Sequence, residues 1–427
     1  MPPRGLRVGV VFGGRSVEHD VSIITGLQAC EALDERHEPV PLYIDRQGRW
    51  FTGPSLREIA TYRAGPLPAG GPLAPTPVSL DLSSGTLRPS APDAPPAERR
   101  RGIFGGAARE RGGEASGVPQ RLDVVIPATH GTQGEDGCLQ GALELADIPY
   151  AGPTLEAAVL AMNKARTKAI LRAAGIPVLE DITLRREEYE RLGAERVIER
   201  VRARFDLPVY AKPASLGSSV GVSRCTDERT LADALELCFE LDRLALVEPA
   251  VEGGREINCA VLGRPGVEPR ASLCEQPVAG DGGFLSYEDK YLRGGSKHGG
   301  PDKSGEPGRG AKQGGMSSAQ RIIPAPIGEE LTDAVQDLAR RTFEAIGGAG
   351  VTRVDLLLDD QERLFVNEPN TIPGSFAYYL FEPAGLPFPD LMDALIELAL
   401  AEHAERRRTT RTFESNLLAM RGEGTKR

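Results

Sequence analysis

Residues 351–370 read VTRVDLLLDDQERLFVNEPN, and this stretch decides the architecture of the C-terminal half of the chain. Two mainly apolar runs flank the polar tetrapeptide DDQE, a pattern that predicts two antiparallel strands joined by a tight turn. Side chains alternate between the faces of a strand, so Arg353 and Asp355 share one side, as Glu368 and Asn370 do further on. We therefore expect acids, an amide and a guanidinium to converge on one side of a hairpin.

The pairing register of this hairpin sets the expected contacts. If Leu358 pairs with Arg363, then Arg353 lies opposite Glu368 and Asp355 lies diagonal to it. Carboxylate and amide oxygens suit Mg²⁺ bound together with nucleotide phosphates, and a neighbouring guanidinium can stabilise an oxyanion. The alternative is a ladder of surface ion pairs, but an asparagine followed by the turn TIPG adds nothing to such a ladder.

A second candidate site follows a strand predicted over residues 207–212. The loop PASLGSSVG at 213–221 consists mainly of small residues whose backbone N–H groups can wrap phosphate oxygens, while Lys212 supplies positive charge. An ordinary hairpin turn is the alternative interpretation. The chain has no G-x-x-x-x-G-K-[ST] sequence, so the P-loop kinase class loses its main support.

A helix is predicted over residues 155–174, because Thr154 is a suitable N-cap and Gly175 follows the apolar stripe. Lys164 lies on this helix and would be another cation for a phosphate. Taken alone, it is more typical of a solvated helix face. We expect a new domain to begin near this N-cap.

The N-terminal half shows two strand-then-helix units. An apolar run at 6–12 leads into GGRS and a helix pattern, and a second run at 122–129 leads through HGTQGEDG into a helix at 139–146. Together they predict a parallel sheet. A G-x-G-x-x-G fingerprint is absent, which disfavours a dinucleotide-binding dehydrogenase. Glu18, at a helix start, could bind a ligand ammonium or simply stabilise the helix N-terminus.

Composition narrows the class of partner. The 427 residues carry a formal net charge of −10, which argues against a basic nucleic-acid binder. No secretory signal and no apolar window long enough to span a membrane are found. The six cysteines are scattered and are expected to be small buried apolar residues. We expect a cytoplasmic protein with small-molecule partners, no nucleic acid and no membrane.

Two segments differ from their surroundings. Residues 62–120 hold ten Pro and ten Gly and are predicted to be a flexible insertion without a function, so that deleting 66–116 should preserve activity. Residues 293–319 hold nine Gly and follow the motif YEDKY at 287–291, which makes them a candidate lid. A lid of this kind could exclude water from a reactive intermediate.

Taken together, the motifs resemble those of the D-alanine-D-alanine ligases of the ATP-grasp superfamily. GGRSVEHDVS, HGTQGEDGCLQGALE, MNKARTK, AKPASLGSSVG, YEDKY, TRVDLLL and NEPNTIPG occur in the order of that family. The resemblance implies an α/β protein of three-domain ATP-grasp architecture with a parallel-sheet N-terminal domain. The implied parts are a substrate domain at 1–153, a central domain at 154–248, a C-terminal domain at 249–403 and a tail at 404–427.

The resemblance also implies ATP and two Mg²⁺ or Mn²⁺ ions as cofactors. The implied phosphate contacts are Lys164, Lys212 and Lys290. The implied adenine-binding segment contains Glu248 and Val251, and the implied ribose-binding acid is Glu256. Its metal ligands fall on Asp355, Glu368 and Asn370. The segment from Glu248 to Glu256 is one residue longer than in many relatives, which makes Val251 the least certain of these positions.

The remaining implied roles concern the substrates. By position, the residues implied to surround the reacting atoms are Glu18, Ser218, Tyr291, Arg353 and Gly374, the last through its backbone N–H. Glu18 would bind the first D-alanine's ammonium with His130 nearby, and Tyr379 and Leu380 would contact the second substrate. Tyr379 departs from the family pattern, because familiar relatives carry a small hydroxyl residue there.

The implied reaction is ligation of two D-alanines for peptidoglycan precursor synthesis. The first D-alanine attacks the γ-phosphate of ATP, and the second D-alanine's amine attacks the resulting acyl phosphate. The resemblance further implies a homodimer. Two alternatives remain, namely a ligase that joins D-alanine to D-lactate or D-serine, and an ATP-binding regulatory protein without turnover. The complete set of acids, amide and guanidinium argues against the second.

Overall fold

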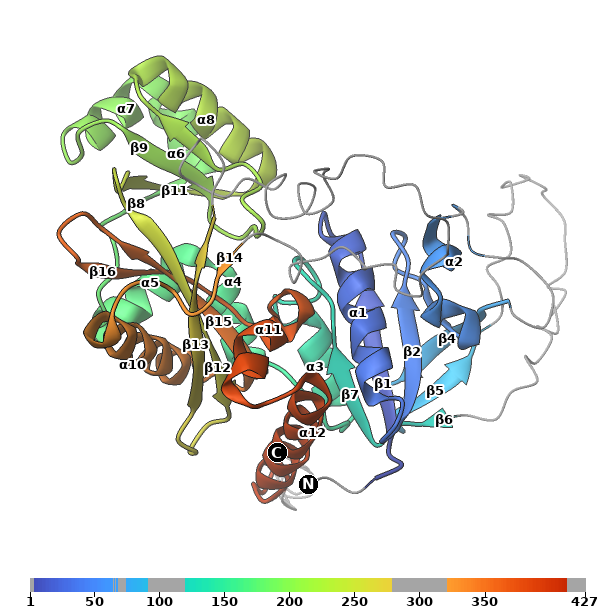
Figure 1. The fold of residues 1–427 in the computed structure, drawn as a ribbon. Coiled ribbons are helices and arrows are strands. Elements are labelled where there is room, and N and C mark those ends of the chain that lie inside the picture. Colours follow the sequence, from blue (N-terminus) through green and yellow to red (C-terminus); the bar gives the residue numbers. More distant parts are fainter. Residues whose placement is uncertain are drawn as a thin grey trace, which may run out of the picture.

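The computed structural model describes residues 4–63, 65, 67, 74–90, 120–278 and 321–412, which form three sheets with helices packed on them (Figure 1). This arrangement confirms the predicted α/β class. The first sheet has seven strands in the order β6-β5-β4-β3-β2-β1-β7. They are β1 (Arg7–Gly13), β2 (Glu38–Ile44), β3 (Trp50–Thr52), β4 (Thr76–Asp81), β5 (Thr86–Pro89), β6 (Gln120–Arg121) and β7 (Val124–Pro127).

Only part of the first sheet is parallel. β1 pairs in parallel with β2 on one side and with β7 on the other, as the strand-then-helix pattern predicts. Strands β3 to β6 extend the sheet in antiparallel fashion. The short helices η1 (Pro54–Arg57) and α2 (Ile59–Arg63) lie between β3 and β4 in the chain.

The expectation of a flexible insertion over residues 62–120 is wrong for part of that segment. Strands β4 and β5 form a hairpin within the sheet, and Val78 and Leu87 are buried in its core. Apolar residues alternate with polar ones in this hairpin, a signal that the high Pro and Gly content obscured. Deletion of 66–116 would remove these buried side chains, so it should not be harmless. Residues 91–119 lie outside the described residues.

The two faces of the first sheet carry different helices, because β1 alternates its side chains. Val10 and Phe12 pack against α1 (His19–Leu33), whereas Val11 packs against α3 (Cys138–Leu145). The loops that follow β1 and β7 therefore lie between helices on opposite faces.

The second sheet is antiparallel, with the order β10-β9-β11-β8, and has its own core. Its strands are β8 (Ile182–Arg185), β9 (Val209–Pro213), β10 (Ser223–Cys225) and β11 (Leu244–Pro249). The helices α6 (Arg186–Leu192), α7 (Ala194–Arg202) and α8 (Glu228–Leu241) belong to this part. In Figure 1 it forms the green unit at the upper left.

The third sheet is also antiparallel, with the order β14-β13-β12-β15-β16. Its strands are β12 (Arg255–Gly263), β13 (Arg270–Pro277), β14 (Arg321–Ile322), β15 (Gly350–Leu358) and β16 (Leu364–Asn370). The helical segments that follow β14 or β16 are α10 (Glu329–Ala345), η4 (Gly374–Ala377), α11 (Tyr378–Phe381), η5 (Glu382–Ala384) and α12 (Phe388–Arg407).

The helix predicted over 155–174 is two helices, α4 (Leu155–Met162) and α5 (Lys164–Ala173). Thr154 is the N-cap of α4, as predicted, but Asn163 leaves helical geometry and caps α5 by accepting a 3.1 Å hydrogen bond from the backbone N–H of Arg166. Lys164 is therefore the first residue of a helix. Leu171 of α5 packs in the core of the third sheet, although this helix falls within the central domain predicted over 154–248.

The C-terminal helix α12 returns to the first domain. Leu391 and Leu395 share one hydrophobic cluster with Val10 and Phe12. The helix continues past the predicted boundary at 403, and Arg406 donates a 2.6 Å hydrogen bond to Glu144 of α3. Residues of the predicted tail therefore contact the first sheet's helices, since the Arg406 guanidinium binds a carboxylate of α3.

The predicted hairpin β15–β16 forms, but the predicted register is wrong. Leu358 pairs with Leu364 rather than with Arg363. The carboxylate of Asp359 accepts a 3.0 Å hydrogen bond from the backbone N–H of Gln361, which stabilises a turn wider than the predicted one.

The expectation that the cysteines are buried is confirmed only in part. Five cysteines are buried, but Cys138 is exposed, because it occupies the first position of α3 at the surface. Among the described residues, no helix has both the length and the apolar character that crossing a membrane requires.

We predict that Asn163→Ala lowers the free energy of unfolding by about 1 kcal/mol, because the substitution removes the N-cap of α5. Asn163→Asp keeps an acceptor at the cap and should retain most of the stability. Urea unfolding followed by circular dichroism measures both variants. Equal losses for alanine and aspartate would show that the cap is not the reason.

Candidate active site

A row of polar side chains crosses the third sheet. Direct pairing joins Glu275 to Asn258, Asn258 to Asp355, and Asp355 to Glu368, so all four lie on one face. Asp355 reaches Glu368 because the pairing shifts by one residue between Asp355 and Leu356, which corrects the predicted diagonal arrangement. Nothing in the residue alternation of a single strand indicates such a bulge.

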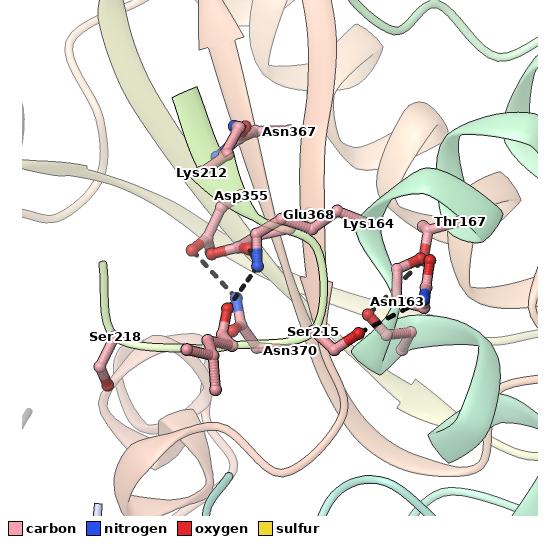
Figure 2. Close-up of polar contacts among 12 residues, drawn as sticks. Asn163, Lys164, Thr167, Lys212, Ser215, Ser218, Asp355, Asn367, Glu368 and Asn370 are labelled. Carbon is pink, nitrogen blue, oxygen red and sulfur yellow. Dashed lines mark hydrogen bonds and ion pairs between the residues drawn. The ribbon is translucent and has the colours of Figure 1, made fainter. Parts of the chain in front are cut away.

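Arg353 extends this row into a tighter cluster. Its Nε and Nη2 donate to the two carboxylate oxygens of Asp355 at 2.6 and 2.7 Å, and Asn370 Nδ2 donates to Asp355 Oδ2 at 3.0 Å. Burial opposes the charged guanidinium, but the Asp355 carboxylate raises the pKa of Arg353 well above its usual value. The predicted convergence of acids, amide and guanidinium is confirmed, and Figure 2 shows Asp355, Glu368 and Asn370 gathered together.

The two predicted lysines meet this hairpin from the other parts of the chain. Lys164 Nζ lies 3.0 Å from Glu368 Oε2 and donates to the carbonyl of Leu216 at 2.6 Å. Lys212 Nζ donates to Asn367 Oδ1 at 3.4 Å. Figure 2 shows Lys212 beside Asn367 and Lys164 near Glu368. The two lysines and the hairpin β15–β16 therefore belong to one site.

The loop after β9 has the backbone of an anion cradle. Ser218 and Ser219 have φ values of 51° and 58°, and Gly221 has a φ of 74°. Left-handed residues in succession turn neighbouring N–H groups toward one side, which is the geometry of a phosphate-binding nest. This loop faces the hairpin through the Lys164 contact to Leu216.

A buried lysine that the motif analysis did not identify completes the cation set. Lys168 is 2% exposed, and its Nζ and that of Lys212 both bind the carboxylate of Glu248. Burial lowers the pKa of Lys168. Burial alone would raise the pKa of Glu248, but the charges of Lys212 and Lys168 lower it. Lys168 follows Lys164 by one helical turn, a spacing that could have identified it.

A pocket between the first and third sheets brings these groups together with residues of the N-terminal half, and we call it the catalytic pocket. Its lining consists of Glu18, His130, Glu135, Gly217, Ser218, Arg353, Glu368, Asn370 and residues 372–374. Ser218 donates a hydrogen bond to the carboxylate of Glu18, so these two predicted residues meet. A Cβ on Gly217 would lie 3.0 Å from Glu18 Oε2, so glycine permits this approach.

Glu135 is a half-buried acid of this pocket that the sequence did not single out. Its carboxylate accepts hydrogen bonds from the backbone N–H groups of Gly131 at 2.7 Å and Ile372 at 3.2 Å, and it thereby ties the first domain to the segment after β16. Burial and the neighbouring charge of Glu18 raise the pKa of Glu135. Its position in GEDG gave a weak signal, because one acid in a glycine-rich loop is common.

His130 is fully enclosed in the wall of the same pocket. Its Nε2 lies 2.9 Å from the hydroxyl of Thr25. Burial lowers the pKa of His130 to about 4, and the charge of Arg353 acts in the same direction. The ring is therefore neutral near pH 7 and can exchange hydrogen bonds without carrying charge.

The predicted contacts to the second substrate differ in their environments. Tyr379 is buried beneath the guanidinium of Arg321, which lies 3.8 Å from the centre of its ring, and burial raises the pKa of its hydroxyl. Arg321 in turn donates a 2.8 Å hydrogen bond to Glu275. Leu380 is buried in the hydrophobic cluster shared with β1, so its side chain is not available to a polar ligand. Tyr379 is thus linked to the polar row of the third sheet through Arg321 and Glu275, whereas the Leu380 side chain has only apolar surroundings.

Four further predicted site residues are not among those that line the catalytic pocket in the described structure. Val251 follows β11 and Glu256 lies at the start of β12, so both are on the connection between the second and third sheets. Lys290 and Tyr291, like the candidate lid at 293–319, lie outside the described residues.

The donor set fits a divalent cation. Asp355 and Glu368 offer carboxylates on one face, and Asn370 offers an amide oxygen beside them. The described part of the chain holds no group of three His, Cys, Asp or Glu side chains placed to bind a metal, so the third oxygen donor would be this amide. Both carboxylates now contact cationic side chains, so the site already balances negative charge with positive charge.

Comparison with known proteins gives consistent results. The profile described as the N-terminus of D-Ala-D-Ala ligase matches residues 7–153, and the C-terminal profile matches 170–300 and 310–397. D-alanine–D-alanine ligase A of Escherichia coli K12 is 35% identical over 405 residues, which is 93% of this chain and 97% of that protein. The Bacillus cytotoxicus ligase is 33% identical over 414 residues, covering 96% and 99%.

Solved structures give the same assignment. The D-alanine–D-alanine ligase of Coxiella burnetii is similar with a TM-score of 0.70 at 28% identity, covering 95% of this chain and 97% of that one. The VanG D-Ala:D-Ser ligase of Enterococcus faecalis also has a TM-score of 0.70, at 25% identity, covering 93% and 100%. With both profiles matched in order and relatives similar over nearly its whole length, this chain belongs to the D-alanine–D-alanine ligase family.

Proposed function

We propose that this protein uses ATP to join two D-alanines into D-alanyl-D-alanine for peptidoglycan precursor synthesis. The observation that carries the proposal is the contact of Lys164 with Glu368, beside the Arg353–Asp355 pair. This juxtaposition supports a site in which the lysines would bind phosphate, the carboxylates would bind a metal, and the guanidinium would stabilise an oxyanion. Family membership and the names of the relatives support the same reaction.

The nucleotide would lie between the second and third sheets. Lys164 and Lys212 would contact its phosphates together with the loop after β9. The connection from Glu248 to Val251 would meet the adenine through backbone groups, because the Glu248 side chain is occupied by two lysines. Glu256 would bind the ribose, and Lys290 would add a further phosphate contact.

Asp355, Glu368 and Asn370 would hold two Mg²⁺ ions, or Mn²⁺ in their place. Such ions, when bound, offset the negative charge of the transferring phosphoryl oxygens. Arg353 and the backbone N–H of Gly374 would act on the developing oxyanion of the substrate carboxyl group. A preorganised donor of this kind is typically worth ~10²- to 10³-fold in rate.

The first D-alanine would lie in the catalytic pocket. Glu18, held by Ser218, would bind its ammonium group, and the neutral His130 would lie beside it. Its carboxylate would then attack the γ-phosphate to give an acyl phosphate and ADP. Tyr291 would belong to the same set near the substrates.

The second D-alanine would attack the acyl phosphate with its free amine and release phosphate. Water is the competing nucleophile, so the site must exclude it. Tyr379 would contact the second substrate from beneath Arg321. D-serine is a second candidate acceptor, because a tyrosine replaces the usual small hydroxyl residue and a similar solved structure is a D-Ala:D-Ser ligase. We further propose that the protein acts in the cytoplasm as a homodimer.

An acceptor panel tests this proposal. With ATP and D-alanine as donor, we expect phosphate release and a product whose mass is that of D-alanyl-D-alanine, in preference to products with D-serine or D-lactate. Glu368→Gln should lower kcat by roughly 10²-fold or more, because a carboxylate ligand is lost. Glu362→Gln, an exposed substitution in the turn of the same hairpin, is the matched control. ATP binding without D-alanine-dependent ADP formation would favour the regulatory alternative.

We predict that Lys168→Met weakens nucleotide binding roughly tenfold or more. Without Lys168, Glu248 has only Lys212 as its cation, and a nucleotide phosphate that takes Lys212 would leave a buried carboxylate uncompensated. The double variant Lys168→Met/Glu248→Gln removes both charges and should recover much of the affinity. Calorimetric titration with MgADP measures both. A double variant as weak as the single one would contradict this charge balance.

We predict that the His130 ring stays neutral down to about pH 4. An unfolded histidine titrates near its ordinary value of 6.5, so the unfolded chain binds more protons than the folded one between these values. The free energy of unfolding should therefore fall as the pH drops from 6.5 toward 4. NMR titration of labelled histidine rings, assigned with His130→Gln, measures the pKa directly. A titration near 6.5 would disprove the assigned burial effect.

A further inference from the structure

A second cavity lies in the first domain, at the carboxyl ends of β1, β2 and β7 and on the face that α3 covers. Its volume is about 280 Å³, and within the described residues it shares no lining residue with the catalytic pocket. β1 leads into α1 on one face and β7 leads into α3 on the other, so the strand order reverses here. Ligands of open α/β sheets bind in crevices at such reversal points.

Glycines keep this cavity open. Gly14 has a φ of 104°, and a Cβ at this position would meet nothing within 4 Å, so it borders open space. A Cβ on Gly48 would lie 2.4 Å from Nε of Arg15. The absence of a side chain at Gly48 therefore allows the guanidinium of Arg15 to lie at the cavity.

The lining combines one cation with an apolar surface. Arg15 is fixed by the backbone carbonyl of Gln47, which accepts from Nε at 3.0 Å and from Nη2 at 2.6 Å. The apolar part of the lining is formed by Ile44, Trp50, Leu139 and Ala142. No Asp or Glu of the described residues lines the cavity. The nearby carboxylate of Asp136 accepts hydrogen bonds from the backbone N–H groups of Gln133 and Cys138.

An unsatisfied hydroxyl lies in the same wall. Thr129 is 3% exposed, and its Oγ1 has no hydrogen-bond partner among the described residues. Buried polar groups in native proteins are nearly always paired, with protein, water or ligand. The Thr129 oxygen is itself shielded from solvent, so a ligand in the cavity would reach it only if the loop after β7 shifts.

The same two loops separate the cavity from the catalytic pocket and contribute lining residues to both. In the loop after β7, Thr129 and Gly134 line the cavity, whereas His130 and Glu135 line the catalytic pocket. In the loop after β1, residues 13–15 line the cavity and Glu18 lines the catalytic pocket. A ligand that shifts either loop would move groups that face the substrates.

We propose that this cavity is a regulatory site for a small monoanionic carboxylate with a compact apolar body. The carboxylate binds Arg15, and the apolar body packs between Trp50 and Leu139. A zwitterionic amino acid is a poor fit, because no acid in the described part of the chain lines the cavity to pair with an ammonium group. Occupancy changes the affinity for D-alanine through the shared loops, an effect that rests on the proposed function, whereas the binding itself does not.

Binding is tested with meta-fluorobenzoate, followed by fluorine NMR. We expect saturable binding that Arg15→Gln weakens by about tenfold, since a charge-assisted hydrogen bond is lost. Ala142→Phe should abolish it by filling the cavity. The neutral meta-fluorobenzamide and the cationic meta-fluorobenzylamine are the matched control ligands and should bind more weakly. Equal binding of all three ligands, or no binding of the carboxylate, would overturn the proposal.

Cys138 provides an independent readout on the unmodified protein. It lines the cavity and is exposed, whereas the other five cysteines are buried. Alkylation by iodoacetamide should therefore label Cys138 first, and saturating meta-fluorobenzoate should slow that labelling, as mass spectrometry would show. An unchanged labelling rate would contradict binding at this site, even where Ala142→Phe fails to fold.

The regulatory effect is measured in the ligase assay. Saturating meta-fluorobenzoate should change the KM for D-alanine by about twofold or more in the wild-type protein and leave it unchanged in Ala142→Phe. Binding and Cys138 protection without any kinetic change would refute regulation while retaining the site. A wild-type protein without turnover would refute the proposed function but leave the binding and labelling results valid.

Discussion

The bidentate pair of Arg353 and Asp355 is the interaction on which the site depends. A buried guanidinium or carboxylate alone would be costly, and each is retained because the other compensates it at hydrogen-bonding distance. The same principle extends outward, since Glu368 faces Lys164 and Glu248 faces Lys168 and Lys212. The centre of the protein is therefore a network of alternating charges, and it exists before any ligand arrives.

Strand alternation predicted the essential part of this network from sequence. Because side chains alternate between the two faces of a strand, the sequence predicts which residues of β15 and β16 share a face, and the observed pairing confirms that prediction. The register was wrong because it depends on a turn held by the Asp359 side chain and on a bulge beside Asp355. Likewise, the helix break at Asn163 depends on one side chain capping a helix end, which periodicity does not reveal.

Some site residues have only weak local signals in the sequence. Lys168 and Glu135 are charged residues of a helix and a loop, and only the fold shows that they lie beside partners distant in sequence. Several features coincide along the chain in the motifs that contain Lys164, Lys212 and Arg353, and the structure brings these three side chains to the hairpin β15–β16. Pairing across domains leaves no comparable trace in a single sequence.

The return of α12 to the first domain has a mechanical consequence. One hydrophobic cluster contains residues of β1 and α1, of β12 and β15, and of α12, so the first and third sheets form a continuous solid. The second sheet has a separate cluster of its own. Because the connection after β11 joins it to β12 without a shared hydrophobic cluster, the apolar packing of the second sheet is independent of the packing that unites the other two.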